Sequence, residues 1–147
     1  LVPDIWDHGY VIVEFENNMR AMLELCMFAE GAKYQEEISI TGDTGKIEAF
    51  VPGPARFWPK KLGAPPIPKI VVSPRDKSGL REFDVPVDEM ILEAGDHNGS
   101  TFYQHQKFMR VVDGHQSPEV TLNDGIWAVR MGNAAQFSAE TGKVVNF

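Results

Sequence analysis

The chain has 147 residues, of which 43% are apolar and 24% charged, a composition typical of a globular protein that buries a core without metal or disulfide staples. Its net charge of −7 argues against nucleic acid or an anionic membrane surface as the main partner, because both require a basic surface. One cysteine excludes an internal disulfide, and neither a membrane-spanning run nor a signal peptide is recognisable, so we expect one cytoplasmic domain over residues 1–147.

The chain begins with a predicted β-hairpin. Residues 10–16 and 19–30 have the side-chain pattern of β-strands, in which alternate residues point to opposite faces. The Asn-Asn pair at 17–18 between them tolerates the positive φ of a tight turn. The second strand is apolar on both sides, which is typical of a central strand or of a strand that meets another subunit. We interpret Cys26 as a small buried hydrophobe rather than a nucleophile. The face that we expect to mediate self-association carries Met22, Cys26 and Phe28.

A second hairpin follows, so the sheet is predicted to be largely antiparallel. The strand pattern of alternating side chains recurs at residues 34–40 and 46–51, on either side of a Gly-Asp-Thr-Gly turn. Ile38, Ile40 and Ile47 are expected on a buried face. Six prolines then interrupt regular pairing over residues 52–68. The Phe57-Trp58 pair in this segment could dock a partner or simply pin the segment onto the domain.

The remaining elements complete an α+β fold. Two further strands are predicted at 69–73 and 80–85, and one or two helical turns at 88–94. A helix then runs from a Ser100 cap to Gly114, and a short extended piece covers 118–120.

The last helix has the clearest boundaries. Thr121 and Asp124 form a variant of the capping box, and Gly142 can end the helix in the left-handed conformation. Residues 143–147 are expected to return as a strand. The whole pattern predicts a mixed or largely antiparallel sheet of six or seven strands, with two main helices covering one face.

The sequence contains no dinucleotide-binding, P-loop, nucleophile-elbow or zinc-protease motif. Asp96, His97 and His105 match no standard metal-ligand spacing, so no metal site is predicted. His97 lies in a polar loop before a helix N-terminus, which favours oxygen-rich or anionic ligands but is also consistent with a plain capping loop. Tyr34 could point its hydroxyl into a cleft or pack by its ring at a strand edge.

Three pieces of the chain, taken in order, form a recognisable set. The first is the strand and turn Tyr-Val-Ile-Val-Glu-Phe-Glu-Asn-Asn at 10–18. The second is the hairpin Glu-Ile-Ser-Ile-Thr-Gly-Asp-Thr-Gly-Lys-Ile-Glu at 37–48. The third covers 118–145, above all Asp-Gly at 124–125 and Ser-Ala-Glu-Thr-Gly-Lys at 138–143. Together they resemble the C-terminal domain of the Gfo/Idh/MocA oxidoreductases, the glucose–fructose oxidoreductase and inositol dehydrogenase family.

The resemblance implies a substrate-binding and oligomerisation domain of an enzyme that transfers hydride between NAD or NADP and a sugar or cyclitol. The family's glycine-rich nucleotide loop, its Glu-Lys-Pro lysine and its catalytic Asp-x-x-x-His segment do not occur in these residues, so no catalytic or cofactor-binding residue is carried over. We expect the chain alone to bind no NAD(P) and to be inactive. The positions expected to lie nearest a polyol substrate are Tyr34, His97 and Tyr103.

Two readings of the function remain open at this point. In the first, the chain is a fragment or truncated product of a dehydrogenase, self-associating through its open sheet face. In the second, it is a stand-alone, non-catalytic binding or assembly module with the same fold. A scaffold built on the proline-rich residues 52–68 is a weaker third reading, because compact domains often hold such loops rigid.

Overall fold

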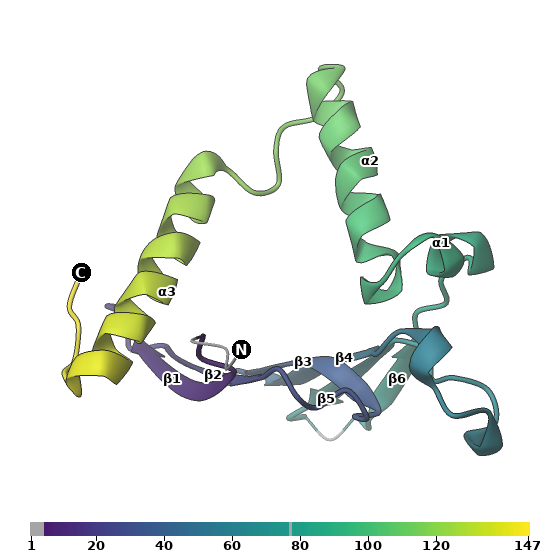
Figure 1. The fold of residues 1–147 in the computed structure, drawn as a ribbon, viewed down its shortest axis with the longest axis horizontal. Helices are drawn as coiled ribbons and strands as arrows, with labels where there is room; N and C mark the ends of the chain where they lie inside the picture. The colour runs from purple at the N-terminus through teal and green to yellow at the C-terminus, as the bar shows by residue number, and fades with distance from the viewer. Residues whose placement is uncertain (1–4, 77) are drawn as a thin grey trace. The chain divides into compact units, whose positions relative to one another are not determined.

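The computed structural model describes residues 5–76 and 78–147 and has the predicted α+β architecture (Figure 1). The described residues form two compact units, one made of 5–26 with 108–147 and the other of 27–107. The strands are β1 (His8–Glu14), β2 (Arg20–Cys26), β3 (Tyr34–Thr41), β4 (Gly45–Pro52), β5 (Lys69–Pro74) and β6 (Arg81–Asp84). The α-helices are α1 (Glu89–Ala94), α2 (Ser100–Val112) and α3 (Leu122–Thr141), and short 3₁₀ helices cover Ala55–Phe57, Lys60–Leu62 and His97–Gly99.

The six strands are divided between two antiparallel sheets, whereas the sequence predicted one. The hairpin β1–β2 forms one sheet, and the other has the strand order β3-β4-β5-β6. Each strand of the second sheet pairs with the next along the chain, as a meander requires. None of the helices in the described residues is long and apolar enough to cross a membrane.

In the first unit, the hairpin turn forms as predicted, with Asn18 in the left-handed region at φ 63°. The second strand is shorter than predicted, because the first residue of β1, His8, pairs with Cys26 and the ladder ends there. Phe28 therefore lies beyond the strand and does not share its face with Met22. β2 is paired on one side only among the described residues, so it is an edge strand rather than a central one, and the predicted burial of Cys26 is wrong.

The helix α3 begins and ends where the sequence indicated. The Thr121 hydroxyl accepts a hydrogen bond from the Asp124 backbone N–H at 3.3 Å, and the Asp124 carboxylate accepts one from the Thr121 N–H at 2.8 Å. These bonds satisfy two donors that a helix start otherwise leaves open. The pKa of Asp124 lies below its usual range, chiefly because its carboxylate also accepts a hydrogen bond from the Thr121 hydroxyl at 2.7 Å and, second, because it accepts the Thr121 N–H. Gly142 ends the helix in the left-handed conformation, at φ 66°.

Two short strands predicted around α3 do not form. Residues 118–120 make a bend, and residues 143–147 follow the helix without strand pairing in the described structure. The apolar pattern of the last residues serves a different contact. Phe147 packs edge-on against Trp127 of α3, with ring centroids 5.6 Å apart. The end of the chain is thus held by side-chain packing rather than by a sheet.

The four-stranded sheet of the second unit has one mainly apolar face and one face that carries most of its charged residues. Its register places these apolar residues on a common face: Ile38, Ile40, Ile47, Ala49, Ile70, Val72 and Phe83. The shared face is as predicted, but its burial is not, since Ile38 is 63% and Ile40 61% exposed. The other residues of this unit cover only one end of the face, near Val51, where the candidate site lies.

The opposite face of this sheet carries ion pairs, both between and within strands. Lys69 of β5 lies 3.1 Å from Glu82 and 3.4 Å from Asp84 of β6, and the hydrogen bond that its ammonium donates to the Glu82 carboxylate is the main cause of its raised pKa. Lys46 and Glu48 of β4 pair at 2.6 Å. Asp84 therefore belongs to this network. Opposite charges on facing strands favour the observed register.

Candidate functional site

The candidate site is built around the 3₁₀ turn His97–Gly99, which joins α1 to α2. Its three residues all adopt left-handed backbone conformations, with φ values of 60°, 49° and 82°. The His-Asn-Gly sequence suits this turn, because these residue types tolerate positive φ better than most. Ser100 is already helical at φ −57° and ψ −41°, so the expected Ser100 cap is replaced by this turn.

Gly99 is required for a second reason besides its φ. A Cβ atom placed there would lie 2.8 Å from Cγ2 of Ile91, 3.1 Å from Cγ1 of Val87 and 3.2 Å from Cε2 of Tyr103. The turn thus lies directly against α1 and the first turn of α2. A side chain at position 99 would push these elements apart.

Two hydrogen bonds attach the turn to the end of the sheet. The Asn98 side-chain amide donates to the backbone carbonyl of Pro52, the last residue of β4, at 2.6 Å. The His97 ring nitrogen Nδ1 lies 2.9 Å from Oε1 of Glu36 in β3. Glu36 thus orients the histidine. Both residues are more than half exposed, so this pair positions the ring while leaving it accessible.

A bidentate ion pair joins the turn to the proline-rich residues 52–68. The guanidinium of Arg56 donates to both carboxylate oxygens of Asp96, the Nη2–Oδ2 distance being 2.8 Å. The pair lowers the pKa of the Asp96 carboxyl below its usual range, chiefly through the hydrogen bond from Arg56. The same bond raises the pKa of Arg56. Arg56 also lies over the ring of Phe57, with its Cζ atom 4.5 Å from the centroid.

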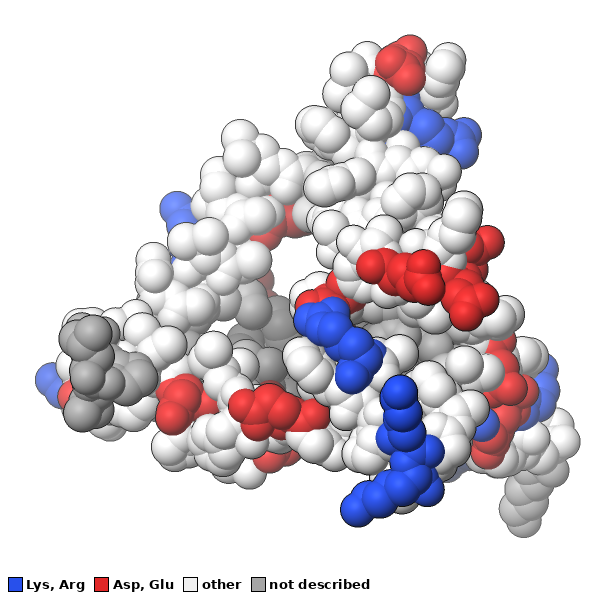
Figure 2. Space-filling view, turned by 45° about the vertical axis from the view of Figure 1, so that its right-hand side comes forward, with Lys and Arg blue, Asp and Glu red and all other residues white. Residues whose placement is uncertain are grey.

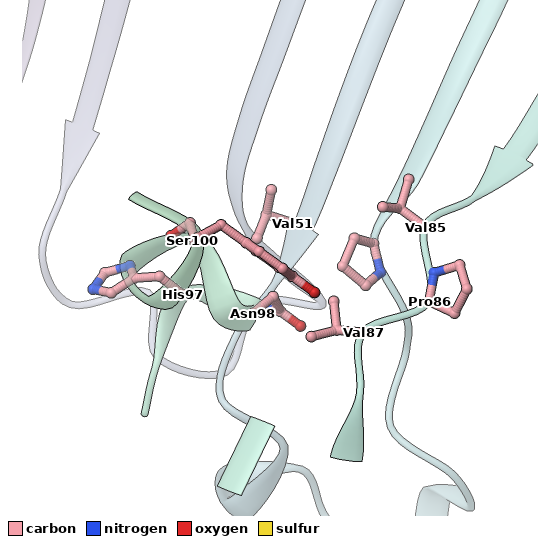
Figure 3. Close-up of a pocket in the computed structure, with 9 residues that line it drawn as sticks. Val51, Val85, Pro86, Val87, His97, Asn98 and Ser100 are labelled. Atoms are coloured by element: carbon pink, nitrogen blue, oxygen red, sulfur yellow. The ribbon is translucent and has the colours of Figure 1, made fainter. Parts of the chain in front are cut away.

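Beside the turn is an open pocket of about 310 Å³ (Figure 3). One side is apolar and comes from the ends of the strands and the residues after β6: Val51, Pro68, Val85, Pro86 and Val87. The other side is polar and comes from the turn and the start of α2: His97, Asn98, Ser100 and Tyr103. In Figure 3 the His97 ring points away from the labelled valines, so the polar groups nearest the apolar wall are those of the neighbouring residues.

The structure brings two of the three predicted substrate-facing residues together. His97 and Tyr103 both line the pocket, whereas Tyr34 does not. The Tyr34 ring packs on Phe50, with centroids 5.1 Å apart, and the Lys33 ammonium lies 5.1 Å from the Tyr34 centroid. Tyr34 is paired with Pro52, so it lies next to the site by register rather than inside it.

Sequence reasoning missed the residues that assemble the site. Arg56 and Asp96 are 40 positions apart, and Glu36 and His97 are 61 apart, so no local pattern links them. The His-Asn-Gly triplet was the one available signal, because such a sequence favours a left-handed turn. Within the described part of the chain, no three His, Cys, Asp or Glu side chains are grouped as a metal site would require.

The chain matches a known protein family. A family model described as "Oxidoreductase family, C-terminal alpha/beta domain" matches residues 3–147, almost the whole chain. A comparison with curated proteins finds no match.

Proposed function

Since the chain belongs to the Gfo/Idh/MocA oxidoreductase family, as its C-terminal α/β domain, we propose that it forms the substrate wall and subunit contact of an NAD(P)-dependent enzyme. The enzyme would act on a hydroxyl group of a sugar or cyclitol. The family match over residues 3–147 is the observation that carries this proposal. The pocket beside the His97–Gly99 turn is the part of the chain that we assign to the substrate.

The two sides of this pocket suit a polyol. A sugar or cyclitol ring has apolar C–H faces that can lie on the valines and prolines, and hydroxyls that need hydrogen-bonding partners. Asn98, Ser100 and Tyr103 offer an amide and two hydroxyls, which can both donate and accept. The imidazole of His97, oriented by Glu36, adds a further polar group at the rim. We assign these residues to binding and orientation, and no catalytic role to any of them.

The nicotinamide cofactor implied by the family has no fitting site among the described residues. Pyrophosphate binding requires a glycine turn that leads from a strand into a helix. Gly45 starts β4 within a strand-to-strand hairpin, and Gly99 follows the helix α1 rather than a strand. We therefore propose that this chain binds and orients the substrate, and we assign no hydride-transfer step to its residues.

The assembly role rests on β2. Met22 is 69% exposed on an edge strand, and Cys26 on the same strand is exposed too. Apolar side chains exposed in this way mark contact surfaces. The same observation also favours the second candidate function, a non-catalytic binding or assembly module. The two candidates differ in whether the pocket takes a polyol.

Chemical-shift mapping of the 147-residue chain with a panel of sugars and cyclitols tests the proposal. Amides 97–103 and those of Val51 and Val87 should shift in a saturable way with at least one ring polyol. Ethylene glycol at the same hydroxyl concentration is the control and should leave them unchanged. Shifts confined to Phe57 and Trp58, or none with any polyol, would refute the substrate role and leave the assembly module as the better candidate.

A further inference from the structure

The polar side of the pocket depends on a backbone conformation that has to be held in place. His97 and Asn98, which both line the pocket, have φ values of 60° and 49°, and Gly99 follows at 82°. Left-handed conformations are unfavourable for residues other than glycine, and they persist only where the surroundings fix them. The directions of these polar side chains therefore depend on the contacts that hold the turn.

Three consecutive residues, 96 to 98, each make a side-chain hydrogen bond to a different part of the same unit. The partners are Arg56 for Asp96, Glu36 for His97 and the Pro52 carbonyl for Asn98. Two of these partners, Pro52 and Arg56, belong to the proline-rich residues 52–68. Arg56 does not line the pocket, yet it is bound to the residue directly before the turn.

Arg56 is suited to fix Asp96, because both its backbone and its guanidinium are held. It lies in the 3₁₀ helix Ala55–Phe57, in which the Phe57 N–H donates to the Pro54 carbonyl at 3.0 Å. Its guanidinium donates to both carboxylate oxygens of Asp96, and a two-armed pair fixes the plane of a carboxylate as well as its position. The Asp96 side chain is thus held in one orientation immediately before the turn.

The ion pair is open to solvent. The Arg56 side chain is 57% exposed and that of Asp96 is 38% exposed. Figure 2 shows charged side chains standing on the surface of the chain in the same way. Dissolved salt can screen such a pair. Exposed ion pairs usually add little to the stability of a whole protein, so the main effect expected of this pair is the local placement of Asp96.

We propose that Arg56 is a positioning residue of the pocket, which raises the affinity for a polyol without touching it. By binding Asp96, Arg56 keeps the His97–Gly99 turn in the conformation that takes the ligand. This inference rests on the proposed function and adds a control of that same site from outside the pocket. The apparent affinity of a site falls in proportion to the fraction of molecules in the binding conformation. Loss of the ion pair lowers this fraction, so salt weakens the binding even of an uncharged ligand.

Titration of the 147-residue chain with an uncharged polyol tests this inference. The probe is myo-inositol or glucose, whichever shifts the amides 97–103, and these amides report binding. Arg56→Gln should weaken binding about three- to tenfold, as expected for a residue that acts on a site indirectly. Arg20→Gln is the matched control, because it breaks another exposed arginine–carboxylate pair, with Glu14 in the other unit. The control should bind as the unmodified chain does.

Two further readouts separate positioning from a purely structural role. Asp96→Asn and the double variant Arg56→Gln/Asp96→Asn should each weaken binding as much as Arg56→Gln does, because all three remove the same pair. Raising the salt concentration from about 10 mM to about 1 M should weaken binding to the unmodified chain but not to Arg56→Gln. The amides 97–99 of the variants should also exchange faster in the absence of ligand.

The inference and the proposed function can fail separately. Equal affinities of the unmodified chain and Arg56→Gln would overturn the inference, even if urea unfolded the variant more easily. An equal loss in Arg20→Gln, or a double variant whose loss is the product of the two single losses, would also overturn it. In these cases the unmodified chain still binds, so the proposed function stands. If no sugar or cyclitol shifts the amides 97–103, the proposed function fails and the inference falls with it.

Discussion

At the scale of single residues, the site depends on a backbone that few sequences can adopt. Three consecutive left-handed residues occur at the His97–Gly99 turn, and such conformations persist only where the surroundings hold them in place. Here the Asn98–Pro52 and His97–Glu36 hydrogen bonds hold the first two residues. The third residue, Gly99, has no side chain, and a Cβ atom there would lie only 2.8 Å from Ile91.

Gly99→Ala should lower the free energy of unfolding by about 1–3 kcal/mol, through its positive φ together with the contacts of the new Cβ. Gly114→Ala is the matched control, because Gly114 has a similar φ of 72° but no atom within 4 Å of the added Cβ. The control should lose only about 1 kcal/mol. Urea unfolding measures both losses, and equal losses would contradict the assigned packing at Gly99.

The Arg56–Asp96 pair should be visible in a pH titration. The folded-state pKa of Asp96 lies below its ordinary value of 3.8, so the pair stabilises the attached segment above that value and is lost as the pH falls through the lowered pKa. A carboxyl-carbon NMR titration should therefore give a midpoint below 3.8. In Arg56→Gln the midpoint should rise toward the ordinary value, and the amides of residues 55–62 should exchange faster. An unchanged midpoint in this variant would contradict the ion pair.

At the scale of secondary-structure elements, local signals predicted the structure well. The capping box of α3, the Gly142 end and the Asn17-Asn18 turn each depend on residues within four positions of one another. Two of the features predicted wrongly are the length of β2 and a strand at 143–147. Each depends on whether another strand lies alongside to pair with it, and a local sequence pattern does not contain that information. The ion pairs of the candidate site lie 40 and 61 positions apart, which explains why its polar loop was predicted but its partners were not.

The capping box allows a test of α3 alone. Thr121→Ala removes the hydroxyl that accepts the Asp124 N–H, and it should destabilise the protein by about 1 kcal/mol. Thr121→Ser keeps the hydroxyl and should be nearly neutral. Thermal unfolding followed by circular dichroism measures the difference. If the alanine and serine variants melted together, the cap would not contribute to stability.

At the scale of the whole molecule, we expect the chain to self-associate through β2. Met22→Lys places a charge on its exposed apolar edge and should shift the chain toward monomer in light scattering at about tens of micromolar. Phe28→Lys should have a smaller effect, because Phe28 lies beyond the paired strand. Met90→Lys, at a side chain 76% exposed elsewhere, is the control. An unmodified chain that is already monomeric at this concentration would rule out the contact.

The central claim is that the pocket beside the His97–Gly99 turn binds a polyol, and one titration tests it most directly. Binding of the best sugar or cyclitol is compared between the unmodified chain and Tyr103→Phe, which keeps the ring and removes the hydroxyl. Loss of one neutral hydrogen bond of about 1 kcal/mol predicts about fivefold weaker binding. Tyr10→Phe, whose hydroxyl is bound to Glu24 at 2.9 Å in the other unit, should bind as the unmodified chain does. Equal affinities for the unmodified chain and Tyr103→Phe would contradict the account.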